Sequence, residues 1–135
     1  TEVYNYCTHL QQKGYRVLLD NNLEYEQYKR NVNKSYISID AWGGGDCCGR
    51  IWEIFANKSC CFSQKYNIVF PYSFQDGESF VSYRTIQEFE EKMMYYLDNK
   101  QKCLEVAEKG YQHLMKRHTS KQRVKYLFEV LGHVV

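Results

Sequence analysis

The sequence predicts an α/β fold, with a small parallel sheet, flanking helices and a helical C-terminus. Helical and strand patterns alternate along residues 2–83, and such alternation is typical of an open parallel sheet. The candidate strand at 15–19 is a nearly continuous apolar run, as expected for a buried parallel strand. The chain has 135 residues, a length that suits one core. We therefore expect residues 1–135 to form a single Rossmann-like domain.

The first part of the chain divides into elements at its turn-forming residues. Apolar residues at helical spacing predict a helix before Gly14, which is a typical C-terminal stop, and a second helix after the Asp20-Asn21-Asn22 turn. A short helix is expected behind the glycine-rich loop. The helices are predicted at 2–13, 24–32 and 49–57, and the strands at 15–19, 35–40, 59–63 and 79–83.

The remaining elements are helices with recognisable starts. Thr85 and Glu88 form a capping box, in which a hydroxyl and a carboxylate satisfy free backbone amides, and Thr119 and Gln122 form a second. Asn99 is the expected N-cap of the helix between them. Apolar stripes follow each start, so we expect three helices over residues 85–131.

Composition limits the classes of partner. The chain has 18 basic and 16 acidic residues, and a formal net charge of +2 is too balanced to favour nucleic acid or an anionic membrane. No apolar run approaches the roughly 20 residues that span a bilayer, and the first residues lack a signal-peptide pattern. We expect a cytoplasmic protein without a nucleic-acid partner. Any peripheral association with a membrane would use a domain outside this sequence.

Six cysteines allow three interpretations. We favour reduced thiols that pack in the core of a cytoplasmic protein. A disulfide framework is the second, although the adjacent Cys60 and Cys61 would point to opposite faces of a strand and could not share one partner. A zinc site is the third, and the cysteine spacings do not match those of known zinc ligands. We expect no metal.

Residues 35–64 contain the strongest candidate for a binding site. A predicted strand leads into three consecutive glycines and a short helix. Glycine lets a ligand approach the backbone, and the first amides of a helix favour an anion. Arg50 can hold a phosphate, and Glu53 on the same face can accept from a ribose diol. This predicts a site for a nucleotide-like ligand, formed by Gly43, Gly44, Gly45, Asp46, Gly49, Arg50 and Glu53.

Structural alternatives explain the same residues. Arg50 and Glu53 can form an i,i+3 surface ion pair, and three glycines can form a flexible loop. The pattern is neither the dinucleotide fingerprint G-x-G-x-x-G nor a P-loop. Asp40 and Asp46 flank the glycines and can serve either a ligand or a turn. No catalytic residue is identified, because the four scattered histidines are more typical of surface or capping positions.

Several motifs in the chain resemble those of a known enzyme family. The runs GRIWEIFANKSCCFSQ and NIVFPYSFQDGESFVSY are similar to the donor-binding half of GT-B glycosyltransferases with a C-terminal domain of the "glycosyl transferases group 1" type, CgeB-like proteins included. The matching positions are Arg50, Trp52, Glu53, Asp76, Gly77, Val81, Tyr83, Ala107, Gly110, His118, Thr119 and Arg123.

The resemblance covers about residues 4–131 and implies a domain that binds a UDP-, GDP- or TDP-sugar. It implies that Glu53 binds the nucleotide ribose and that Gly45, Gly49 and Arg50 lie near the diphosphate or sugar. Such enzymes carry an acceptor domain before the donor domain, so this chain is expected to be the C-terminal half of a larger enzyme with an unknown acceptor. They generally need no metal, which agrees with the lack of a D-x-D pair, and we expect no cofactor.

Two other function classes remain open. One is a non-catalytic α/β protein-interaction module, with Tyr95, Tyr96 and Tyr111 as an exposed partner surface. It predicts no nucleotide binding. The other is a small flavodoxin-like or receiver-like regulator, which is disfavoured because Asp40 is the sole candidate phospho-acceptor and Lys65 is the nearest lysine to a later strand end.

Overall fold

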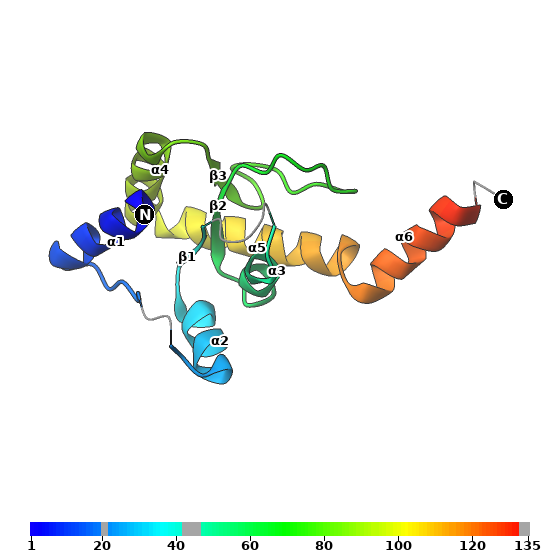
Figure 1. Cartoon of the computed structure of the whole chain (residues 1–135), viewed down its shortest axis with the longest axis horizontal. Coiled ribbons are helices and arrows are strands. Elements are labelled where there is room, and N and C mark those ends of the chain that lie inside the picture. The colour runs from blue at the N-terminus through cyan, green and yellow to red at the C-terminus, as the bar shows by residue number, and fades with distance from the viewer. Residues whose placement is uncertain (20–21, 42–46, 133–135) are drawn as a thin grey trace.

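The structure is a computed structural model that describes residues 1–19, 22–41 and 47–132. Within these residues, helices surround a small sheet, which is the predicted α/β class (Figure 1). The helices are α1 (Glu2–Gln12), α2 (Tyr25–Lys34), α3 (Gly49–Ala56), α4 (Ile86–Asp98), α5 (Lys100–Arg117) and α6 (Ser120–Gly132). The strands are β1 (Ile37–Asp40), β2 (Cys60–Gln64) and β3 (Val81–Tyr83).

The described strands form one parallel sheet in the order β1-β2-β3. Ile37 lies opposite Cys60, and Phe62 lies opposite Val81. The helix α3 connects β1 to β2, as parallel pairing requires a long crossover. The carboxyl ends of the strands therefore meet at one edge of the sheet, the edge at which ligands bind in open α/β folds.

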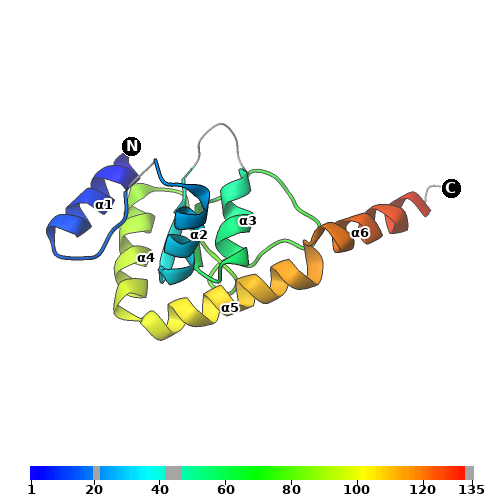
Figure 2. The same ribbon diagram turned by 90° about the horizontal axis from the view of Figure 1, so that it is seen from below.

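Helices cover both faces of the sheet (Figure 2). Cys60 and Phe62 of β2 pack in a cluster with residues of α1, α4 and α5. Cys61, between them, packs in a second cluster with Ile54 and Phe55 of α3. Adjacent cysteines thus face opposite sides of the sheet, as predicted, and all six cysteines carry free thiols.

The predicted strand at residues 15–19 is wrong: within the described residues this segment joins no sheet. Its side chains alternate, with Tyr15, Val17 and Leu19 packed against the α1 and α4 side of the core. Its backbone is bonded elsewhere, because the amide of Tyr15 donates to Leu10 and the carbonyl of Val17 accepts from the side chain of Gln11. A strand requires a partner ladder, and the apolar pattern could not show that it would be lacking.

Most predicted helix ends are confirmed, and one cap is reassigned. Gly14 has φ +92, a conformation that favours glycine after a helix. The hydroxyl of Thr85 accepts from the amide of Glu88, and the Glu88 carboxylate accepts from the amide of Arg84. Asn99 makes no side-chain cap to α5. Instead its Nδ2 donates to the carbonyl of Tyr95, so its side chain closes the end of α4.

The long helix α5 crosses beneath the sheet and leads into α6, which extends away from the body of the chain (Figures 1 and 2). No described side chain of α6 is buried. Its exposed apolar residues recur at helical spacing as Val124, Leu127, Phe128 and Leu131. No helix among the described residues combines the length and apolar character needed to cross a membrane.

Candidate functional site

The predicted site lies at the carboxyl edge of the sheet, between the end of β1 and the start of α3. The strand β1 ends at Asp40 and the helix begins at Gly49. Gly49, Arg50 and Glu53 are described. The other predicted site residues, Gly43, Gly44, Gly45 and Asp46, lie outside the described residues.

The sequence of α3 separates an apolar face from a polar one. Ile51, Ile54 and Phe55 are buried against the sheet and α5, while Arg50 is exposed and Glu53 half-buried on the opposite side. The N-cap residue Cys48 makes no side-chain cap. The first turn of α3 therefore presents amides that are not capped by its N-cap side chain, with an arginine among them, an arrangement that favours an anion.

Two tyrosines of α2 surround the Glu53 carboxylate. The Tyr25 hydroxyl donates to Glu53 Oε1 over 3.3 Å, and the Tyr25 ring stacks on that of Tyr28 at 6.3 Å between centroids. Burial, and then the negative charge of Glu53, raise the pKa of Tyr28 to about 12. The buried Tyr28 hydroxyl has no hydrogen-bond partner of normal geometry among the described residues. Glu53 is thus oriented by a neighbouring helix while part of it stays accessible.

Arg50 and Glu53 form no ion pair within the described part of the chain. The surface ion-pair alternative is therefore not what the structure shows. Nor does the Arg50 guanidinium donate to any other described side chain in the hydrogen-bond network. A cation that pairs with none of the described side chains and a half-buried carboxylate thus lie one helical turn apart on the same face of α3.

The Asp40 side chain is buried at this edge of the sheet and does not face solvent. Its side chain is 2% exposed. One carboxylate oxygen accepts from the Cys48 thiol over 3.1 Å, and the other accepts from the Ser63 hydroxyl over 3.4 Å. Asp40 therefore joins the ends of β1 and β2 to the start of α3. Its burial also removes the support for a receiver-like phospho-acceptor, which must be accessible.

Residues at the end of α5 and the start of α6 pack against Trp52 of α3. The Arg123 guanidinium of α6 lies 4.7 Å above the Trp52 ring, and one of its nitrogens lies 3.5 Å from His118 Nδ1. His118 itself lies 5.4 Å from Trp52 between ring centroids. Three positions of the family motifs, far apart in the sequence, are thus in contact, which places the start of α6 beside α3.

The two histidines of this region are closer than the sequence suggested. His113 Nε2 lies 2.6 Å and His118 Nε2 lies 2.9 Å from the carbonyl oxygen of Tyr72, so both rings hold one loop. Tyr72 has φ +56, an unusual conformation for a residue with a Cβ. Burial lowers the pKa of His118, and the nearby positive charges of Arg123 and Arg117 lower it further. His118 is the C-cap residue of α5, one of the two kinds of position expected for the histidines, and His113 is not buried; the sequence did not show that the two rings share one partner.

Sequence reasoning thus found the polar face of α3 and missed its neighbours. Tyr25 and Tyr28 were visible only as residues at helical spacing, because the contact with Glu53 joins separate helices. Within the described residues, no group of three His, Cys, Asp or Glu side chains is placed to hold a metal ion. The donor set that the site does offer consists of backbone amides, an arginine and a carboxylate, which suits an anionic ligand with hydroxyl groups.

Comparison with known proteins agrees with this geometry at the level of the family. Searches of curated proteins and of solved structures each find no significant match. A family model described as "Glycosyl transferase-like" matches residues 5–129, which include every element from α1 into α6. The chain therefore belongs to the glycosyl transferase-like family.

Proposed function

We propose that this domain binds the nucleotide-diphosphate sugar donor of a GT-B glycosyltransferase. The observation that carries the proposal is the pair on α3: Arg50 in the first turn, which forms no ion pair among the described residues, and, one turn later, Glu53 held by the Tyr25 hydroxyl. In this proposal the first-turn amides of α3 and Arg50 hold the diphosphate, and Glu53 accepts hydrogen bonds from the ribose.

The same groups would assist the chemical step. When the glycosidic bond to the diphosphate breaks, negative charge develops on the leaving nucleoside diphosphate. Fixed amides and a guanidinium aimed at that charge stabilise the transition state without reorganising. Tyr25 would keep the Glu53 carboxylate in place, so that the ribose anchors the donor while the sugar is transferred.

We further propose that the acceptor is bound with a second domain outside this sequence. The support is the resemblance to the donor half of two-domain enzymes, including the CgeB-like proteins, together with the match of the family model over residues 5–129. A UDP-, GDP- or TDP-sugar is the proposed donor, without a metal or cofactor. Gly43, Gly44, Gly45 and Asp46 lie outside the described residues and stay predicted members of this site.

Calorimetric titration of UDP, GDP and TDP into the chain tests the donor site. Glu53→Ala should weaken binding of the preferred nucleotide about 10- to 100-fold, because it removes hydrogen bonds that a charged acceptor makes to the ribose. The folded state should persist, since Glu53 lies on the solvent side of α3. Glu105→Ala is the matched control, because it removes a helical glutamate from an exposed i,i+3 pair on α5. Equal affinity of wild type and Glu53→Ala would exclude Glu53 from the site.

The alternative function is a non-catalytic protein-interaction module, and α6 is the feature that favours it. Its exposed residues include Leu127 at 55% and Phe128 at 69% exposure. The tyrosine surface expected from the sequence is not formed, because Tyr96 is buried in the core, Tyr111 is half-buried and Tyr95 alone of the three is exposed, at 54%. Absence of binding to all three nucleotides, in a chain that is folded, would favour this alternative over the donor domain.

A further inference from the structure

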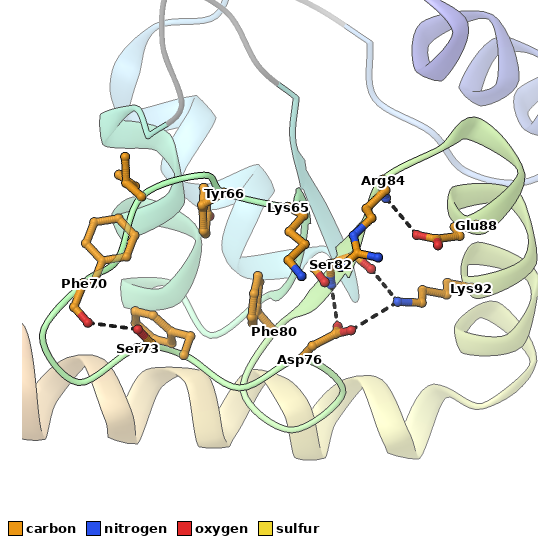
Figure 3. A pocket seen from close by; sticks show the side chains of 12 residues that line it. Lys65, Tyr66, Phe70, Ser73, Asp76, Phe80, Ser82, Arg84, Glu88 and Lys92 are labelled. Atoms are coloured by element: carbon orange, nitrogen blue, oxygen red, sulfur yellow. Dashed lines mark hydrogen bonds and ion pairs between the residues drawn. The ribbon is translucent and has the colours of Figure 1, made fainter.

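A pocket lies at the carboxyl ends of β2 and β3, beside the loop that joins them (Figure 3). It has a volume of about 400 Å³, within the range of small-molecule sites. It exists because β3 is an edge strand: α3 packs on β1 and β2, while β3 packs against α4. The loop between β2 and β3 closes the opposite side. The described residues that line the pocket thus come from β3, α4 and the loops that follow β2 and β3.

The strand register places two cations at this pocket. Gln64 pairs with Tyr83, and the amide of Lys65 donates to the carbonyl of Tyr83 over 2.9 Å. Lys65 and Arg84 are therefore the next residues in register, just beyond the carboxyl ends of neighbouring strands. Both line the pocket (Figure 3). Like charges opposite each other on adjacent strands destabilise a sheet unless an anion lies between them.

The carboxylates near the pocket do not neutralise these two cations. Asp76 accepts from the amide of Ser82 over 2.7 Å and pairs with Lys92 over 3.3 Å. Glu88 accepts from the backbone amide of Arg84, not from its guanidinium. Within the described residues, neither the Lys65 ammonium nor the Arg84 guanidinium forms a hydrogen bond or an ion pair.

The remaining wall of the pocket is aromatic. The rings of Tyr66 and Phe80 lie nearly parallel, at an interplanar angle of 8°, and Phe70 and Phe74 extend this surface from the loop. A ligand that fills the pocket therefore presents an anionic group to one side and a weakly polar face to the other. A sugar ring that bears a carboxylate or a phosphate has this form and this size.

We propose that this pocket is a second ligand site, separate from the nucleotide site, which binds an acidic monosaccharide unit. Lys65 and Arg84 hold its carboxylate or phosphate, and the aromatic wall packs against the ring. Arg84 supplies the planar pair of donors that matches either anion, and Lys65 supplies a point charge. A second saccharide site beside a donor site is where an acidic acceptor, or an acidic unit of a growing chain, would lie.

The test is an NMR titration of the ¹⁵N-labelled chain at low ionic strength with D-glucuronate, glucose 6-phosphate, inorganic phosphate and glucose. We expect saturable shifts of amides around Lys65 and Arg84 with one or both acidic sugars, and binding at least tenfold weaker for glucose. Lys65→Gln and Arg84→Gln should each weaken binding about 3- to 10-fold, as expected for exposed charge pairs, and the double variant should abolish it. Lys116→Gln removes an exposed lysine of α5 that does not line the pocket and should change nothing.

Each outcome has a defined meaning. Binding of glucuronate alone identifies a carboxylate ligand, and binding of glucose 6-phosphate alone identifies a phosphate. The proposal is overturned by unchanged affinity in the double variant, by equal binding of glucose, or by no saturable shift with any acidic sugar. Inorganic phosphate that binds as tightly as glucose 6-phosphate would refute the role of the aromatic wall. Displacement of glucuronate by UDP would show that Lys65 and Arg84 bind the nucleotide instead. Failure of UDP to bind, with binding of the acidic sugar retained, would contradict only the donor proposal.

Discussion

Gly110 of α5 marks the closest approach between α5 and the layer that carries the candidate site. A Cβ at this position would lie 2.6 Å from the backbone oxygen of Ser79 and 2.9 Å from Cδ1 of Phe55. Phe55 is fully buried on the apolar face of α3, and the amide of Ser79 is bonded to Gln75. We predict that Gly110→Ala destabilises the domain, although alanine is the better helix former.

The magnitude follows from two opposing terms. Alanine in a helix interior is favoured over glycine by about 1 kcal/mol. Overpacking costs about 1–3 kcal/mol, and the upper end applies here because a backbone oxygen and a fully buried ring must both move. The net loss is about 2 kcal/mol. For a domain of this size that corresponds to a decrease in Tm of about 8 °C, or of about 1 M in the urea midpoint.

Urea denaturation followed by circular dichroism measures this loss. Gly132→Ala is the matched control, because the same substitution at the end of α6 meets nothing within 4 Å and should change the free energy of unfolding by less than about 0.5 kcal/mol. An unchanged or increased midpoint for Gly110→Ala would refute the close approach of α5 to α3.

Two further predictions concern pH and thiol reactivity. Burial lowers the pKa of His118 in the folded state, so the unfolded chain binds a proton at His118 more readily. The free energy of unfolding should therefore be highest above about pH 6.5 and should fall as pH drops through the lowered pKa. Urea titrations from pH 8 to 5 should show that the free energy of unfolding falls less for His118→Gln than for the wild type. The same pH dependence in both proteins would contradict this role of His118. Cys47 and Cys48 are half-buried, and burial raises the pKa of both thiols, so Ellman's reagent should label them slowly at pH 7 and faster as pH rises. The four buried thiols should react only on unfolding, and mass spectrometry that finds Cys61 labelled in the native protein would contradict the core packing.

The helices were predictable because their signals are local. Amphipathic spacing, Gly14 and the Thr85 capping box define ends that need no information from the rest of the chain. The strand at 15–19 was predicted wrongly for the opposite reason. An apolar run shows that a segment is buried, but hydrogen bonds from another segment decide whether it joins a sheet, and here Leu10 and Gln11 supply the backbone partners instead.

The candidate site, like the fold, has a part that the sequence predicted and a part that it did not. The sequence by itself determined that Arg50 and Glu53 share a face of one short helix behind a strand end, because helical spacing and the glycine run are local features of the sequence. Only the tertiary structure decided what surrounds them: Tyr25 on Glu53, Asp40 buried beneath the edge, and Arg123 over Trp52. It also decided that Lys65 and Arg84 line one pocket, because the register of β2 and β3 is a long-range pairing. Contacts between distant segments depend on how the layers pack, and no local pattern in this chain encodes that packing.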